Sequence, residues 1–507
     1  VPEHLGPDQL AQLPSGKRLG IYKHYLKDEY ARVRSVHEQG GGGCEVAALR
    51  SEVIDTLLRS LFLTATAQDS DSSSLSLMAN GGYGRGLLNP ASDIDLLFLL
   101  PKASHRIDQH QRSIVESILY PLFDLGFKVG HASRSISECI TEARKDPITR
   151  TTLFDHRRLC GNPGLSSDFS HQFRQDCIVK DRVRFFEERK SDIESRYNKF
   201  SSTVFLQEPN LKESPGCMRD FHNLLWISDA LFNTRDLDEL QLRGTLSMNA
   251  CNELKEGFDF LHRLRNCLHY QTGKGTDILT LRLQGIITEK FHYRHKTKLR
   301  RIEALMRDYY LHARDIYQHT ASVFEIAEIE TPVLRPFKLP FRIPFVGRSA
   351  SRTFDGFVVE EGRLSAASED IFSEDPNRLM RLFLHCQKHH LRPSPPLRKL
   401  IKANWHRIDK SFNYSTENRR TFRTILEKKG QVARTLRIMH RCGILGRYLP
   451  EFGALECLVQ HEFFHRYTAD EHTLRCIDQL DALLESDNSS VGRYRQILID
   501  VEDPYAL

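Results

Sequence analysis

The sequence lacks three features that would place the protein outside the reducing interior of a cell. Its eleven cysteines are scattered and never form a C-x-x-C pair, which indicates free thiols rather than a disulfide framework. No window reaches the roughly 18 apolar residues that a membrane helix needs. The first ten residues, VPEHLGPDQL, do not show the basic-then-apolar order of a secretory signal. We therefore expect a cytoplasmic protein without a membrane partner.

The sequence also lacks a block of Lys and Arg residues. Its formal net charge of +6 is spread over 507 residues, which suits a phosphate-rich ligand but is no footprint of nucleic-acid binding. We expect no nucleic acid as the main substrate. A chain of 507 residues is too long for one hydrophobic core, so several domains are expected.

The first third of the chain predicts a compact α/β unit. Apolar strands are expected near residues 75–79, 94–100 and 127–133, with an amphipathic helix near residues 107–125 before the last of them. The helical stretch that precedes these strands is broken by four glycines, Gly40 to Gly43, for which we expect a flexible turn.

The remaining chain predicts helices around a small β insert. Apolar residues recur at spacings of three and four from about residue 136 to residue 330, and again after about residue 375. Between these stretches, VLRPFKLPFRIPFVG carries three prolines, and FDGFVVEEGRL predicts a hairpin. The expected fold class is therefore α/β followed by α. The predicted domains are 1–65, 66–160, 161–330, 331–370 and 371–507.

A glycine pair and an acidic pair carry the predicted chemistry. In GGYGRGLLNPASDIDLLFLL, Gly81 and Gly82 follow a predicted strand, and Asp93 and Asp95 lie at the start of the next one. Side chains on a strand alternate between its faces, so the two aspartates project from the same side with Cα atoms roughly 6–7 Å apart. Glycines let backbone N–H groups approach phosphates closely, and Arg85 adds positive charge there.

This combination predicts a metal-dependent nucleotidyltransferase with a polymerase-beta-like domain. Two carboxylates can hold Mg²⁺, with Mn²⁺ as a substitute, because Mg²⁺ favours carboxylate and triphosphate oxygens over an all-protein cage. An acidic pair alone is commonly a solvated strand end, and a glycine pair alone is a turn, but their spacing favours the functional interpretation. The third carboxylate usual in such enzymes is not evident: its expected position is Gly130, and Asp124 and Glu138 are expected at helix ends.

Four blocks of the sequence resemble the PII uridylyltransferase/uridylyl-removing enzymes of bacterial nitrogen regulation. The first is the glycine and aspartate block, and the second is FKVGHASRS, in which the family also lacks the third acid. The third is PNLKESPGCMRDFHNLLWIS, and the fourth runs from Met439 to Leu474. The resemblance implies transfer of UMP from UTP to a tyrosine hydroxyl of the protein PII, with release of pyrophosphate.

The third block resembles the family's K-x-x-x-G-G-[LI]-R-D box. The resemblance implies nucleotide binding by Lys212, Gly216, Arg219 and Asp220, at the mouth of a helix that follows a Pro-Gly turn. Cys217 replaces the second glycine of the box, which restricts the backbone if this position needs a positive φ. The alternative is a capped helix with ion-paired ends.

The fourth block resembles the start of an HD-type phosphohydrolase, whose metal ligands follow the order His, His-Asp, Asp. His472 matches the first ligand, but none of the 23 histidines is followed by Asp. We therefore expect the start of a truncated HD domain, no glutamine-sensing ACT domains and no uridylyl-removing activity in this chain.

Three interpretations remain open. A related transferase would use another nucleotide or acceptor, as an adenylyltransferase does, because nothing in the loop chemistry selects uracil. A degenerate regulatory module would only hold nucleotide or PII, although the intact glycines and aspartates argue against it. Arg263, Arg265 and His269 share a predicted helix, where helix packing and a role at the site are both open.

Overall fold

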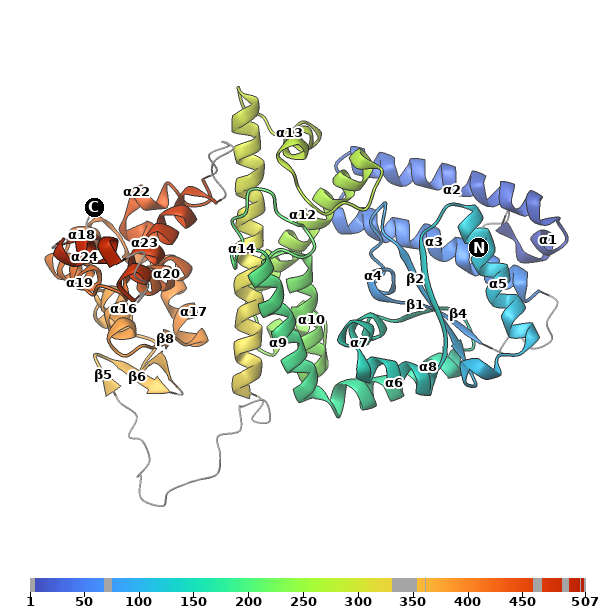
Figure 1. Ribbon diagram of the computed structural model, residues 1–507, viewed down its shortest axis with the longest axis horizontal. Helices are drawn as coiled ribbons and strands as arrows, with labels where there is room; N and C mark the ends of the chain where they lie inside the picture. The colour runs from blue at the N-terminus through green and yellow to red at the C-terminus, as the bar shows by residue number, and fades with distance from the viewer. Residues whose placement is uncertain are drawn as a thin grey trace, which may run out of the picture. The chain divides into compact units, whose positions relative to one another are not determined.

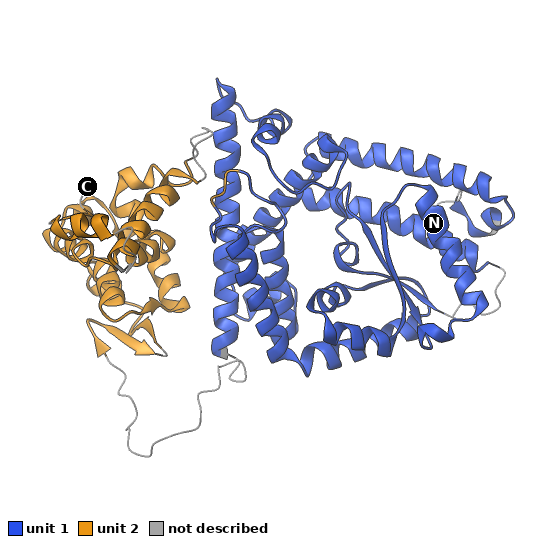
Figure 2. Ribbon diagram, viewed as in Figure 1, with its two compact units in different colours: residues 1–204, 208–335 blue, residues 205–207, 336–507 orange. Residues whose placement is uncertain are grey.

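The chain forms two compact units in the computed structural model. The structure describes residues 5–67, 75–330, 353–360, 362–458, 467–485, 492–501 and 503–505. Residues 1–204 and 208–335 form unit 1, whereas residues 205–207 and 336–507 form unit 2 (Figure 2). The predicted fold class, an α/β domain followed by helices, is confirmed (Figure 1). Within the described ranges, no helix has the length and apolar character that crossing a membrane requires.

Unit 1 begins with three helices, and the glycine run joins the second to the third. These are α1 (Pro7–Ala11), α2 (Ser15–Glu38) and α3 (Gly43–Ala65). At Gly43 an added Cβ would lie 2.1 Å from the carbonyl oxygen of Asp259 and 2.2 Å from the backbone nitrogen of Arg263, both in α12 (Met248–Thr272). The expectation of a flexible turn is therefore wrong for the end of the run, where the missing side chain lets α3 pack closely on α12.

The sheet of unit 1 has four strands in the order β3-β2-β1-β4. The strands are β1 (Ser76–Ala79), β2 (Ile94–Leu100), β3 (Val129–Ser135) and β4 (Arg157–Gly161). β1 pairs antiparallel with β2 and with β4, whereas β2 and β3 are parallel. The first three strands confirm the prediction. β4 lies in a stretch predicted to be helical, because a five-residue strand that begins with two arginines shows no apolar alternation.

The two faces of this sheet differ at the start of β2. On one face, Ile94 and the alternate residues up to Leu100 pack with α3 and α5 (Gln109–Asp124) into a hydrophobic core. On the other face, Leu97 and Leu99 are buried as well, but Asp95 is only half-buried. Because side chains alternate along a strand, β2 presents its acidic residue opposite the core.

The rest of unit 1 is helical. Its helices are α4 (Gly81–Gly84), α6 (Ile136–Lys145), α7 (Pro147–Phe154), α8 (Pro163–Phe173), α9 (Arg182–Lys199), α10 (Met218–Phe232), α11 (Leu237–Leu242), α13 (Leu281–Lys290) and α14 (Lys298–Glu330), in addition to α12. Ser247 caps the start of α12 by accepting from the amide of Ala250, and Gly273 ends the helix at a φ of +64°. α12 contacts both α3 and α14, so it connects the α/β part with the helical part (Figure 1).

Unit 2 combines a small sheet with a helical core of its own. The sheet has the order β5 (Thr353–Phe354), β6 (Phe357–Glu360), β7 (Arg363–Ala366) and β8 (Arg392–Pro393). The predicted hairpin is present, since β6 and β7 are antiparallel. The helices are α15 (Ile371–Glu374), α16 (Arg378–Lys388), α17 (Pro395–Ala403), α18 (Lys410–Tyr414), α19 (Thr416–Leu426), α20 (Val432–Arg441), α21 (Leu445–Tyr448), α22 (Pro450–Gly453), α23 (Ala469–Glu485) and α24 (Gly492–Asp500).

The two units are a coarser division than the five predicted domains. The first three predicted domains lie in unit 1 apart from residues 205–207, and the last two lie mainly in unit 2. The three prolines of the predicted insert lie outside the described residues. The boundaries within each unit stay predictions.

Candidate active site

The glycine turn and the acidic residues lie side by side at one end of the sheet. Gly81 follows β1 and begins the short helix α4 at a φ of +54°, in the region that favours glycine. An added Cβ at Gly81 would lie 3.1 Å from Oδ2 of Asp95. Gly82, the next residue, is half-buried. The backbone of the turn therefore reaches the Asp95 carboxylate with no side chain between them.

The two aspartates differ in their surroundings. Asp93 is exposed just before β2, and Asp95 is half-buried within it. Burial raises the pKa of Asp95, the negative charge of Asp93 raises it further, and Lys212 and Arg85 oppose both effects. The charges of Asp93, Lys212 and Arg85 thus all act on Asp95, although Lys212 is far from the aspartates in sequence.

Gly130 occupies the position beside Asp95 on the neighbouring parallel strand, as predicted. An added Cβ at Gly130 would lie 2.6 Å from Oδ1 of Asp95, so the aspartate covers the space that a third carboxylate would need. Glu138 instead caps α6: its Oε2 accepts from the backbone amide of Ser135 at 2.8 Å. Asp124 is exposed at the end of α5. Both acids lie at helix ends, as expected from the sequence.

Arg85 is held by the carboxylate of Asp155, which the sequence does not predict. Its Nη1 lies 2.5 Å from Oδ2 of Asp155, which is fully buried. The other oxygen of Asp155 accepts from Nε1 of Trp226 at 2.9 Å and from Nη1 of Arg235 at 2.7 Å. Asp155 follows α7 in no recognisable motif, so nothing in the sequence predicts this contact. Arg85 thus reaches the site already oriented by an ion pair.

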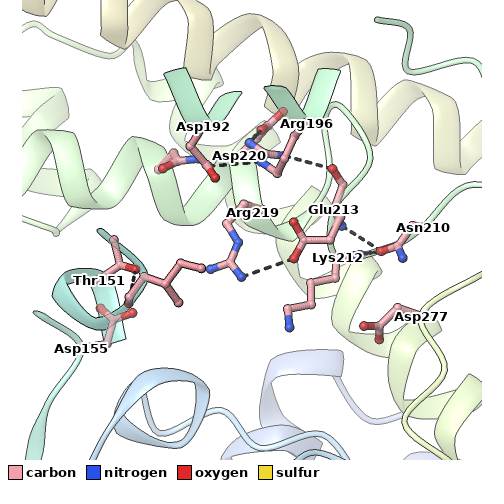
Figure 3. Close-up of polar contacts among 12 residues, drawn as sticks. Thr151, Asp155, Asp192, Arg196, Asn210, Lys212, Glu213, Arg219, Asp220 and Asp277 are labelled. Atoms are coloured by element: carbon pink, nitrogen blue, oxygen red, sulfur yellow. Dashed lines mark hydrogen bonds and ion pairs between the residues drawn. The ribbon is translucent and has the colours of Figure 1, made fainter. Parts of the chain in front are cut away.

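Lys212 brings a cation to the site from the segment before α10. Burial lowers the pKa of Lys212, and the positive charges of Arg219 and Arg265 lower it further. In the described part of the chain, the Lys212 ammonium forms no ion pair within 4.0 Å. Figure 3 shows this ammonium away from the ion pairs that are marked by dashed lines. An ammonium group that is half-buried among other cations favours an anionic ligand.

Arg219 lies on the first turn of α10 and faces the same region. Its Nη2 lies 3.3 Å from Oε1 of Glu213 (Figure 3). Its guanidinium lies over the ring of Trp226 at 5.6 Å from the centroid. Burial lowers the pKa of Arg85, and the positive charge of Arg219 lowers it further, whereas Asp155 acts in the opposite direction. The arginines and Lys212 therefore form one positive cluster beside the two aspartates.

Gly216 and Asp220, the other two residues predicted from the box, are enclosed by protein. Asp220 is 0% exposed and accepts from Arg196, from Tyr197 and from the amide of Gly216, at 2.6, 2.7 and 2.7 Å. Gly216 has a φ of +75°, and an added Cβ would lie 2.0 Å from the carbonyl oxygen of Ala313. These contacts hold the turn before α10 in place. The structure gives both residues a role in shaping the box, and no surface toward a nucleotide.

Cys217 does not disturb the turn. It precedes α10 at a φ of −101°, which any residue adopts. Its buried thiol lies 3.1 Å from the hydroxyl oxygen of Tyr309. The replaced second glycine of the box is therefore no backbone defect in this chain.

His472 lies in unit 2, on α23, and is exposed. Its Nε2 lies 3.8 Å from Sγ of Cys476. Across the described ranges, no group of three or more His, Cys, Asp or Glu side chains is arranged to hold a metal ion. Residues 459–466 of the same block lie outside the described residues. The role of His472 as a first metal ligand stays a prediction.

Three domain families match the chain, and together they cover both units. A nucleotidyltransferase domain matches residues 62–158, which contain the sheet, the glycine turn and both aspartates. The family described as GlnD PII-uridylyltransferase matches residues 184–324, which contain the Lys212 box and α12. The family described as uridylyltransferase GlnD third domain matches residues 357–448 of unit 2. The chain is a GlnD-like protein.

Curated relatives of this family align along most of the chain. The bifunctional uridylyltransferase/uridylyl-removing enzyme of Caulobacter vibrioides is 33% identical over 448 residues, which cover 87% of this chain and 47% of that protein. The enzyme of the same description from Nitrobacter winogradskyi is 31% identical over 489 residues, covering 92% of this chain and 51% of that protein. The GlnD-like chain thus spans about half the length of these relatives.

Proposed function

We propose that this chain transfers UMP from UTP to a tyrosine hydroxyl of a PII signal-transduction protein and releases pyrophosphate. The observation that carries the proposal is the meeting of three segments at one end of the sheet. The turn at Gly81 lies against Asp95, and Lys212 from the third block influences the same carboxylate. The relatives described as uridylyltransferases support uridine as the base, and the matched PII-uridylyltransferase domain supports PII as the acceptor.

The donor set of the site fits Mg²⁺ or Mn²⁺ only together with the nucleotide. Asp93 and Asp95 are close enough for the charge of one to raise the pKa of the other, and Gly130 supplies no further ligand. Mg²⁺ is commonly bound through one or two carboxylates plus substrate phosphates, so two aspartates suffice. When bound, the ion would neutralise charge on the α-phosphate and on the departing pyrophosphate.

The residues of the chain bind and orient the triphosphate in this proposal. The amides at Gly81 and Gly82 approach the phosphates without an intervening side chain. Lys212 and Arg219 place positive charge beside them, and the ion pair with Asp155 fixes the direction of Arg85. Catalysis of phosphoryl and nucleotidyl transfer depends largely on such positioning and charge stabilisation.

The acceptor hydroxyl must lose its proton as it attacks. The phenolic oxygen forms a bond to the α-phosphorus, the bond to the bridging oxygen breaks, and pyrophosphate leaves. Tyrosine has a pKa of about 10, so a nearby base assists. Asp95 is our candidate, because burial and Asp93 make it a stronger base than an ordinary aspartate. No covalent intermediate on the enzyme is required.

The reducing interior of the cell is the proposed location. All eleven cysteines are free thiols. Ten of them are buried or have a pKa that burial raises, rather than being placed for pairing. The cytoplasm is therefore the compartment that we propose.

The test is incubation of the chain with Mg²⁺, purified PII and each labelled nucleoside triphosphate in turn. We expect label from UTP on a PII tyrosine, with one pyrophosphate released for each UMP incorporated. Label from ATP or on another acceptor would favour a related transferase. Binding of UTP without pyrophosphate release would favour a degenerate binding module.

A further inference from the structure

One face of α12 holds the loop that leads to the aspartates. The loop runs from Asn89 to Ser92, directly before Asp93. Nδ2 of Asn89 donates to Oδ1 of Asn266 at 2.7 Å, and Nη1 of Arg265 donates to Oδ1 of Asn89 at 2.5 Å. Asn89 is fully buried, so α12 supplies partners for both ends of its amide. The loop is thereby fixed to a helix more than 170 residues later in the chain.

A second contact fixes the backbone of the same loop. The amide of Ala91 donates to Nδ1 of His269 at 3.1 Å. Nδ1 must therefore carry a lone pair, which places the ring proton on Nε2. Nε2 faces Oδ1 of Asp277 at 3.5 Å, where a negative charge favours this tautomer. The chain from carboxylate to imidazole to backbone amide orients the loop two residues before Asp93.

The same α12 residues also hold the Lys212 segment. Nε of Arg265 donates to Oδ1 of Asp277 at 2.7 Å. The carbonyl oxygen of Asp277 accepts from the amide of Leu211 at 2.8 Å, directly before Lys212. Burial alone would raise the pKa of Asp277, but His269 and Arg265 outweigh burial and keep its pKa well below the ordinary value. The negatively charged carboxylate of Asp277 thus lies against both Arg265 and His269 of α12.

We infer that Arg265 and His269 are positioning residues that hold the Asp93 loop and the Lys212 segment in register with each other. Arg265 contacts the first segment through Asn89, and His269 contacts it through Ala91. Both side chains reach the second segment through Asp277, whose carbonyl oxygen accepts from Leu211. Neither side chain needs to touch the nucleotide. The inference rests on the proposed function, since it assigns the two residues to the same site. It assigns a role at the site to two residues of α12, for which the sequence had left open both helix packing and a role at the site.

The first test compares two replacements of His269. Asn places its carbonyl oxygen where Nδ1 lies and can still accept from Ala91, whereas Gln places its amide where Nε2 lies and cannot. We expect His269→Asn to keep most of the rate, and His269→Gln to lower kcat for UMP transfer by about 10- to 100-fold with a smaller change in KM. Faster exchange of the Ala91 amide with deuterium in His269→Gln than in His269→Asn is the accompanying structural result.

The second test uses two arginines on the same helix. Arg265→Lys keeps the charge but cannot reach Asn89 and Asp277 together, because a single ammonium lacks the guanidinium fork. Arg263, whose guanidinium lies over the ring of Phe291, contacts neither segment through its side chain, so Arg263→Lys is the matched control. We expect a loss of kcat in Arg265→Lys that is at least about tenfold larger than in Arg263→Lys, at equal unfolding temperature.

The outcomes separate this inference from the proposed function. Equal rates and equal Ala91 exchange in His269→Asn and His269→Gln would overturn the positioning role, as would equal rates in the two lysine variants. If the wild-type chain transfers no nucleotide at all, the proposed function fails. Ala91 exchange then still decides the inference, because it reports the loop without any turnover. If His269→Gln does not fold, the arginine pair decides it.

Discussion

The carboxylate of Asp95 lies between two glycines of the site. One of its carboxylate oxygens lies beside the space over Gly130, and the other lies beside the space over Gly81. Both neighbours are glycines, so any side chain at either position would push the carboxylate away. The missing third carboxylate and the position of Asp95 are therefore two aspects of one packing arrangement.

Gly130→Ala tests this arrangement. The new Cβ would come within 2.6 Å of Oδ1 of Asp95, so the carboxylate must move. We expect the rate of UMP transfer to fall by about tenfold or more, with little change in the unfolding temperature. Gly20→Ala in α2 is the control, because an added Cβ there meets nothing within 4 Å. Equal rates in both variants would show that Asp95 does not depend on the glycine.

Lys212→Met tests the positive cluster at the same scale. Removing the ammonium leaves the triphosphate without one charged partner, and such a contact contributes about 1.5–3 kcal/mol. We expect KM for UTP to rise about 10- to 100-fold, measured by steady-state transfer at saturating PII. Lys102→Met, at an exposed position in the same unit, is the control. An unchanged KM in Lys212→Met would remove the lysine from the nucleotide site.

The sequence predicted the residues that a local pattern describes. Gly81, Asp93 and Asp95 stand in a short motif, and Gly130 follows from strand register. It could not predict Asp155, because that residue acts through three side chains that are distant in the sequence. Nor could it show that Asp220 is turned inward, because the sequence of the box is the same whether its aspartate faces a ligand or a buried arginine.

At the scale of elements, α6 shows how a helix start stabilises the sheet edge. Ser135 ends β3 and caps α6, while Glu138 accepts from the amides of Ser135 and Ser104. Partial burial would raise the pKa of Glu138, but these hydrogen bonds outweigh it and lower the pKa from 4.5 to about 2. This capping box joins the strand that carries Gly130 to the helix that follows it.

Glu138→Gln tests the capping box through its pH dependence. The folded pKa lies below the unfolded one, so ionised Glu138 stabilises the fold above pH 4.5, and this contribution is lost as the pH falls toward 2. We expect the variant to unfold more easily by about 1 kcal/mol at pH 7. The difference from wild type should shrink below pH 4.5, as measured by denaturant unfolding. Glu116→Gln, at an exposed position of α5, should show neither effect.

Elements were predictable where their period is clear and their surroundings are local. β2 is an almost continuous apolar run, and the long helices show apolar spacing. β4 is short and starts with two arginines, one of which, Arg157, pairs with Asp55 of α3. The close packing at the end of the glycine run was unpredictable for a related reason, because the contact is made with a helix more than 210 residues later.

At the scale of the whole molecule, the two units have separate hydrophobic cores. One core joins α3, α5 and the sheet of unit 1, and the other joins the helices of unit 2 with its small sheet. All residues of the proposed transfer site belong to unit 1, whereas His472 belongs to unit 2. The transfer chemistry can therefore be changed without touching the block that resembles an HD domain.

His472→Ala tests this separation. We expect the variant to transfer UMP at the wild-type rate, because His472 is no part of the site in unit 1. We also expect neither protein to release UMP from uridylylated PII, since no His-Asp pair occurs in the sequence. Chromatography of released nucleotide measures this. Release by the wild type that is lost in His472→Ala would contradict the expectation.

The most direct test of the account is the rate of Mg²⁺-dependent pyrophosphate release from UTP and PII in Asp95→Asn. This variant keeps the shape of the side chain and removes its charge. Asp124→Asn, at an exposed aspartate of the same unit, is its control. The account predicts a loss of at least about a hundredfold in Asp95→Asn, with unchanged unfolding and a normal rate in the control. Wild-type turnover in Asp95→Asn would contradict it.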